Sequence, residues 1–164
     1  SMNWSGIPLH PENKVVSEGL DMKISWVDES GNPIDPGNLS QGTVFYQRIR
    51  VNNLLDRSLE NLAFNQILPS GWEIENDRFR NNDYQNNSGK EKNQPGKVNI
   101  DYTDIRDDRI YCFFDLAGRN QFAEIEIKLR AVTSGSFELP PAVCEAMYAK
   151  QYKAVSRGRK VQVY

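Results

Sequence analysis

Residues that could do chemistry are few in this chain of 164 residues. Its one histidine, His10, lies in a segment broken by a glycine and two prolines, where no regular element can hold it against a catalytic partner. The sequence contains no phosphate-binding loop, dinucleotide fingerprint or Cys-x-x-Cys pair. We therefore expect a chain that is not an enzyme and that holds no metal or cofactor.

The densest group of charges occupies residues 101–109 and contains four aspartates. Four carboxylates this close together could cradle a calcium ion. Arginines stand among them, however, and aspartate is a common turn former, so ion pairs within a turn explain the pattern better. We interpret Arg106, Asp107, Asp108 and Arg109 as a structural turn.

Two further pairs of reactive residue types also have simple interpretations. Glu73 and Glu75 flank an isoleucine at strand spacing and point together toward solvent, so nothing marks them as an acid and base pair. Cys112 and Cys144 are too few for a zinc site. We interpret them as two buried thiols and leave open whether they pair.

The charge balance excludes one broad class of partner. Lys and Arg total 20 against 22 Asp and Glu, which leaves no electrostatic footprint for nucleic acid or an anionic membrane. A small basic segment at 150–160 is explained by solubility, or alternatively by docking onto an acidic neighbouring domain. Ser1 and Met2 have the character of tag residues, so we expect the chain to be a piece of a longer protein.

The elements that must position these residues are strands. Apolar residues alternate with polar ones in short runs separated by turn residues, and no run has the period of an amphipathic helix. We predict an all-β, antiparallel immunoglobulin-like or fibronectin-like β-sandwich of about seven to nine strands. The predicted strands are 20–27, 43–51, 59–68, 72–74, 98–102, 109–116, 122–131, 137–139 and 160–164.

The domain organisation follows from the same pattern. Residues 1–18 are interpreted as a tag remnant and an irregular lead-in, and residues 19–164 as one domain with a long polar loop at 76–97. Pro140 and Pro141 stop a strand, and the apolar stretch that follows them is predicted to lie at one end of the fold rather than along a sheet.

Several segments together resemble one known family. They read ILPSGWEIEN (67–76), DYTDIRDDRIYCFFDL (101–116), LRAVTSGSFELPPAVCEAMY (129–148) and RGRKVQV (157–163). In this order they resemble the C-terminal, tenth macroglobulin-like domain of bacterial alpha-2-macroglobulins, of the Bacteroides type. The resemblance covers most of the chain apart from the lead-in and the polar loop.

The resemblance implies a domain of a protease-trapping inhibitor, in a parent that is often a lipid-anchored protein on the periplasmic side of the cell envelope. In relatives with a reactive thioester, the last domain packs on the thioester domain, and a Met-Tyr pair helps to keep water from that bond. The matching positions are Met147 and Tyr148, with Val143 and Glu145 in the same contact. Cys144 does not itself match the thioester motif, because Glu-Ala follows it and no Gln completes the motif.

The partners implied are the preceding domains of the parent chain and, through the parent, target proteases, with the fragment itself monomeric. An alternative for Met147 and Tyr148 is that they close one end of the sandwich core. An alternative for the whole chain is an adhesion or carbohydrate-binding module, in which exposed Trp4, Trp72 and Tyr84 would stack on sugar rings.

Overall fold

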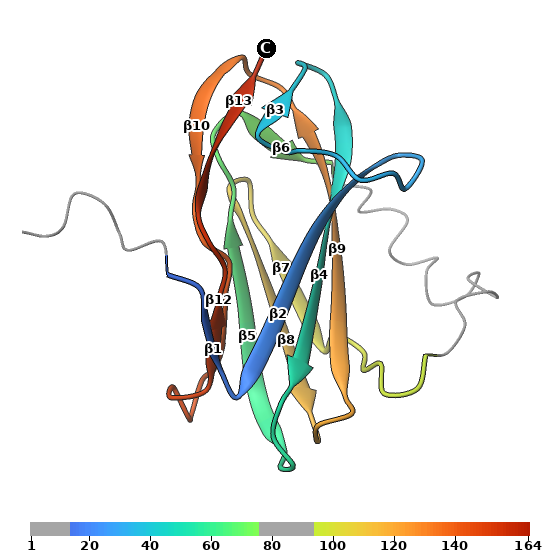
Figure 1. Ribbon diagram of the computed structural model, residues 1–164, viewed down its shortest axis with the longest axis vertical. Helices are drawn as coiled ribbons and strands as arrows, with labels where there is room; N and C mark the ends of the chain where they lie inside the picture. The colour runs from blue at the N-terminus through green and yellow to red at the C-terminus, as the bar shows by residue number, and fades with distance from the viewer. Residues whose placement is uncertain (1–13, 76–93) are drawn as a thin grey trace, which may run out of the picture.

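The computed structural model describes residues 14–75 and 94–164, which form thirteen strands and no helix (Figure 1). In chain order the strands are β1 (Val16–Glu18), β2 (Leu20–Asp28), β3 (Asn38–Leu39), β4 (Val44–Asn53), β5 (Leu59–Ile67), β6 (Trp72–Ile74), β7 (Tyr102–Ile105), β8 (Arg109–Leu116), β9 (Phe122–Ala131), β10 (Gly135–Leu139), β11 (Val143–Ala146), β12 (Lys153–Val155) and β13 (Arg159–Val163).

Two antiparallel sheets face each other as a sandwich. One has six strands in the order β1-β12-β11-β5-β8-β7, and the other has four in the order β2-β4-β9-β6. A small third sheet, β10-β13-β3, lies at the end of the sandwich that carries the C-terminus (Figure 1). The predicted all-β antiparallel sandwich is confirmed, and the seven strands of five residues or more agree with the predicted number.

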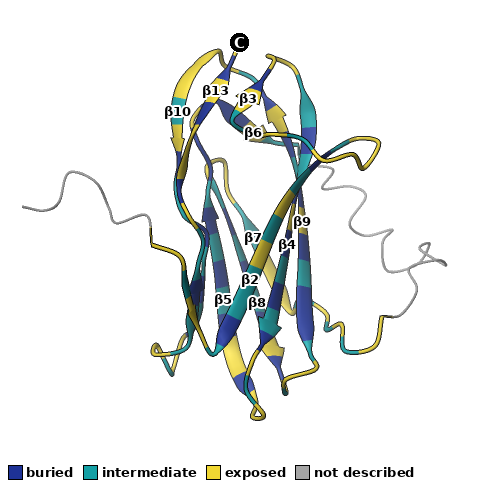
Figure 2. Ribbon diagram, viewed as in Figure 1, coloured by how far each residue is buried: buried dark blue, intermediate teal, exposed yellow. Residues whose placement is uncertain are grey.

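The core is built by the alternation that the sequence displays. In β4 and β9 every second side chain is buried between the sheets, which Figure 2 shows as alternating colours along these strands. An aromatic cluster from three strands of the four-stranded sheet packs against this core, with the Phe45 and Trp72 ring centroids 4.9 Å apart and the Trp26 and Trp72 centroids 5.5 Å apart. Each such buried side chain contributes about 1.5–3 kcal/mol to folding.

Two strand predictions were wrong at their boundaries. Residues 98–100 form no strand, because the chain crosses there from one sheet to the other: Val98 N–H bonds Phe122 O beside the four-stranded sheet, and Asp101 N–H bonds Phe113 O in the six-stranded sheet. The strand of this region is β7, which begins at Tyr102. At the other end, the lead-in predicted to be irregular contains β1, which pairs with β12.

The prediction for the stretch after Pro140 and Pro141 was also wrong. Residues Val143–Ala146 form β11, an interior strand of the six-stranded sheet that pairs with both β5 and β12. The prolines mark the point where the chain leaves the small sheet and enters this one. Their backbone is used by the core: Gln66 Nε2 donates to Pro140 O at 3.1 Å.

The two cysteines are free, buried thiols. Both lie opposite Phe64, Cys144 from β11 and Cys112 from β8, so β5 runs between them. Two strand spacings separate their backbones by about 10 Å, beyond the reach of a disulfide. Burial raises the pKa of Cys112 to about 11 and raises the pKa of Cys144 further.

Candidate interdomain contact surface

The outer face of the six-stranded sheet carries a band of apolar and aromatic side chains. In β11 the inward residues are Cys144 and Ala146, which places Val143 and Glu145 on the outer face. In β8 the outward residues include Tyr111 and Phe113, so the middle of this strand is apolar on both faces, between the charged residues Arg109 and Asp115. A strand that is apolar on both sides is typical of a sheet covered on both sides.

Two cross-strand rows make up this band. The first row runs from Glu145 of β11 through Ala63 and Phe113 to Tyr102 at the edge strand β7. The Phe113 and Tyr102 rings lie with centroids 6.0 Å apart, and Tyr102 is 60% exposed. These two rings form a partly exposed aromatic pair at the edge of this sheet.

The second row lies two residues away from the first along each strand. It joins Val16, Val155, Val143, Asn65 and Tyr111 in register. The Oδ1 atom of Asn65 is buried in this row and accepts no hydrogen bond from any residue that the structure describes. An unpaired buried carbonyl costs about 1–3 kcal/mol.

Met147 and Tyr148 follow this band directly. Met147 comes two residues after Glu145 and continues the outward alternation of β11, beyond the strand's end. Its side chain is 46% exposed, and that of Tyr148 is 85% exposed. The alternative in which these two residues close the core is therefore wrong.

The turn that carries them is anchored at both ends. Ala149 N–H bonds Ala146 O at 3.2 Å, and Ala146 N–H bonds Tyr152 O at 3.1 Å, which closes the connection from β11 to β12. The Tyr152 ring packs on Gly19, where an added Cβ would approach the ring to 2.6 Å. Gly19 also has a φ of +73°, so the position needs glycine for two reasons. Tyr148 thus projects from a turn whose base is fixed.

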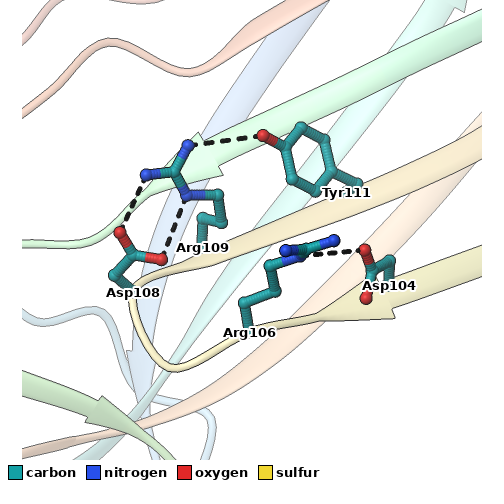
Figure 3. A network of polar contacts seen from close by, with 5 residues as sticks. All are labelled: Asp104, Arg106, Asp108, Arg109 and Tyr111. Atoms are coloured by element: carbon teal, nitrogen blue, oxygen red, sulfur yellow. Dashed lines mark hydrogen bonds and ion pairs between the residues drawn. The ribbon is translucent and has the colours of Figure 1, made fainter.

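The turn predicted at Arg106–Arg109 connects β7 to β8 (Figure 3). Arg106 N–H bonds Arg109 O at 2.9 Å. The Arg106 Nε donates to Asp104 at 3.1 Å, whereas Arg109 donates through two nitrogens to Asp108 at 3.0 and 2.8 Å. The hydrogen bond from Arg109 holds the pKa of Asp108 below its usual range, and the same contact raises the pKa of Arg109.

Each arginine therefore pairs with one acid of this region, Arg106 with Asp104 and Arg109 with Asp108. Within residues 14–75 and 94–164 no three His, Cys, Asp or Glu side chains are grouped as metal ligands would be. The turn borders a shallow hollow at the edge of the apolar band, lined by Asp104, Arg106, Asp108, Arg109, Tyr111 and Phe113.

Two other residues named in the sequence analysis, Trp72 and Arg159, belong to strands outside this surface. Trp72 is only 3% exposed, so it cannot stack on a sugar as the carbohydrate-binding alternative required. His10, Trp4 and Tyr84 lie outside the described residues. Arg159 of the basic segment pairs with Asp35 at 2.7 Å.

No helix in the described ranges has the length and apolar character needed to cross a bilayer.

Sequence reasoning missed the aromatic part of this surface. Tyr102, Tyr111 and Phe113 were assigned no role, because the inward residues of β8 alone account for a buried face. The available signal was the central run IYCFF of this strand, which is apolar in both phases of the strand period.

Comparisons with known proteins agree on one family. Residues 19–151 match the family model described as the bacterial alpha-2-macroglobulin MG10 domain. An alpha-2-macroglobulin homolog of Yersinia pestis is 31% identical over 96% of this chain and 8% of its own length. The alpha-2-macroglobulin of Escherichia coli is 25% identical over 99% of this chain and 10% of its own length.

Solved structures share the fold. The native conformation of E. coli alpha-2-macroglobulin superposes with a TM-score of 0.78 at 21% identity, over 97% of this chain and 10% of that one. Salmonella alpha-2-macroglobulin reacted with methylamine gives a TM-score of 0.72 at 22% identity, over 92% and 9%. The Bacteroides type expected from the sequence stays a prediction. The family model, which matches most of the chain, shows that this chain belongs to the family of bacterial alpha-2-macroglobulin MG10 domains.

Proposed function

We propose that this chain is a non-catalytic domain of a bacterial alpha-2-macroglobulin peptidase inhibitor, and that it acts by docking on another domain of its parent chain. The contact surface is the Met147–Tyr148 turn together with the outer face of the six-stranded sheet from β11 to β7. The observation that carries this proposal is the exposure of Met147 and Tyr148 directly beside the row of Glu145, Phe113 and Tyr102.

The domain that covers this contact surface is proposed to be part of the same protein. This chain spans 7–10% of the length of the curated relatives, so most of each relative lies outside the region compared. An intramolecular partner needs no high intrinsic affinity, because tethering supplies a high effective concentration. A modest apolar band with a polar rim suits such a contact.

The partner is proposed to be the thioester domain, where the parent has one. An activated acyl bond survives only if water and amines are kept away. A polarizable methionine beside an aromatic ring can form an adaptable dry cover over such a bond. The Salmonella relative reacts with methylamine, and the E. coli relative is activated by porcine elastase. For this chain's parent we propose the periplasmic side of the cell envelope and a lipid anchor.

The test is the rate at which methylamine inactivates the full-length parent. The Met147→Ala/Tyr148→Ala double variant should be inactivated about tenfold faster or more than the wild type, because its thioester is less well covered. Tyr46→Ala on the opposite outer face is the matched control and should leave the rate unchanged. Equal rates in the double variant and the wild type would rule out the shielding role.

A second experiment covers a parent without a thioester. The chain is titrated against its parent lacking this domain, and binding is measured by calorimetry. Wild-type chain should bind, and the double variant should bind more weakly. No binding by the wild type would contradict docking itself.

A further inference from the structure

The backbone of Met147 is attached to a neighbouring strand at an irregular point. Met147 N–H donates to Asn61 O at 3.0 Å. Asn61 lies within β5, where the pairing with β8 shifts register between Leu59 and Leu62. The acceptor for Met147 is therefore offered by a β-bulge, a device that re-aims a strand locally.

Asn61 has a backbone conformation that needs support. Its φ is +54°, in the left-handed region, and it is the one residue other than glycine with a positive φ among those described. Asparagine tolerates this region better than most residues, but the conformation still has a cost. Something in the surrounding structure must hold it.

That support comes from a residue of the next strand. Asn61 N–H donates to the Oδ1 atom of Asp115 at 2.7 Å. Asp115 lies near the end of β8 and points outward, two residues after Phe113. Its carboxylate gives the bulged backbone a strong, charge-assisted acceptor, which the regular ladder does not supply at a bulge.

Met147, Asn61 and Asp115 thus form a further row of the outer face. Each lies two residues along its chain segment from the row of Glu145, Ala63 and Phe113. We propose that Asp115 and Asn61 are positioning residues for the Met147–Tyr148 turn: the Asp115 carboxylate fixes the bulge at Asn61, and the Asn61 carbonyl fixes Met147. The importance of this turn for docking rests on the proposed function, but the positioning itself does not.

If Asp115 and Asn61 position the turn, disruptive and conservative substitutions at these two residues should have different effects. Asp115→Ala removes the acceptor, whereas Asp115→Asn keeps an oxygen that can accept the same hydrogen bond. Asn61→Val opposes the left-handed conformation, whereas Asn61→Gly adopts it freely and keeps the carbonyl. Within each pair, the two variants differ mainly in the one feature that is proposed to position the turn.

The experiment is amide hydrogen exchange of the chain by NMR, read at Met147. Asp115→Ala and Asn61→Val should speed exchange of this amide by about tenfold, the loss expected when one hydrogen-bonded contact stops restraining a local opening. Asp115→Asn and Asn61→Gly should stay within about threefold of the wild type. The matched control is Asp56→Ala, which removes another exposed carboxylate, one that bonds Arg119, and should not affect Met147.

Two results would overturn the proposal. One is an unchanged Met147 amide in Asp115→Ala. The other is equal acceleration at Met147 and at amides of the distant strand β9, because it would mean that the variant has lost global stability rather than a local restraint. Exchange at β9 is recorded in the same spectra, so a variant that has lost global stability is recognised directly.

The same variants in the full-length parent separate this proposal from the proposed function. Faster exchange at Met147 in Asp115→Ala, with faster methylamine inactivation of the parent, supports both. Faster exchange with unchanged inactivation and unchanged binding would leave the positioning intact and contradict the docking role of the turn.

Discussion

The two outer faces of this sandwich are made of different residue types. On the four-stranded sheet, neighbouring strands exchange ion pairs: Arg48 with Glu126 at 2.7 Å, Arg50 with Glu124 at 3.5 Å, and Glu75 with Arg130. On the six-stranded sheet, the corresponding rows combine valine, alanine, phenylalanine and tyrosine with a few polar residues, among them Glu145, Lys153 and Asn65.

The difference indicates which of the two outer faces is suited to remain exposed to solvent. Charges that are paired within the four-stranded sheet would lose hydration on docking and gain no new partner, so covering them is unfavourable. Aromatic side chains are enriched in protein interfaces, whereas lysine and glutamate are depleted there. The six-stranded face therefore combines aromatic residues typical of an interface with two exposed apolar residues of the β11–β12 turn, Met147 and Tyr148.

The largest expected effect comes from placing a charge in the middle of the apolar face. Phe113→Lys should weaken binding of the chain to its parent lacking this domain by about 30-fold, corresponding to about 2 kcal/mol for a central aromatic anchor. Calorimetric titration measures this difference.

Tyr46→Lys gives the matched substitution on the other face, since Tyr46 points outward from β4 beside Lys128 of β9. It should leave the affinity within about twofold. Equal losses from both substitutions would remove the distinction between the faces.

A smaller effect is expected from substituting Glu75, which forms ion pairs with Lys128 and Arg130 on the charged face. The hydrogen bond from Arg130, together with the charges of Arg130 and Lys128, holds the pKa of Glu75 below its usual range. Glu75→Gln should lower the free energy of unfolding by about 0.5–1 kcal/mol at pH 7, and Glu73→Gln, two residues earlier in β6, should change it less.

The pH dependence follows from the direction of that pKa shift. Because the folded state favours ionised Glu75, its contribution is complete above the ordinary glutamate pKa of about 4.3 and is lost as the pH falls through the lower folded value. The difference in melting temperature between wild type and Glu75→Gln should thus shrink below about pH 4. A difference that grows in acid would contradict the ion-pair assignment.

The smallest effect is expected on the inner face of the six-stranded sheet. Cys112 and Cys144 are buried and their pKa values are raised, so little thiolate forms at pH 8. A thiol reagent should react with neither cysteine in the folded chain and with both in denaturant. Rapid reaction of one thiol in the folded state would mean that this sheet opens locally.

Much of the fold could be predicted from the sequence. The alternation in β9 and β4 predicted which of their residues share a face, and Cys112 was correctly placed in the core. The strand β11 could not be recognised, because it has only four residues and follows two prolines. Its pairing is decided by β5, which is distant in sequence.

The contact surface was only partly predictable. Met147 and Tyr148 were assigned to a contact through the resemblance, whereas the residues alone favoured a place for them in the core. The support at Asn61 was invisible, because Asn-Leu-Ala-Phe reads as an ordinary strand segment and the bulge depends on Asp115, which is 54 positions away. Local patterns determine strands, and long-range hydrogen bonds determine irregularities within them.

The most direct test of the docking account is hydroxyl-radical footprinting of the free chain and of the full-length parent under identical conditions. The account predicts that oxidation of Met147, Tyr148 and Tyr102 falls in the parent, whereas oxidation of Tyr46 on the charged face does not change. Equal oxidation of Met147 and Tyr148 in the free chain and in the parent would contradict the account, because it would show that nothing covers this turn.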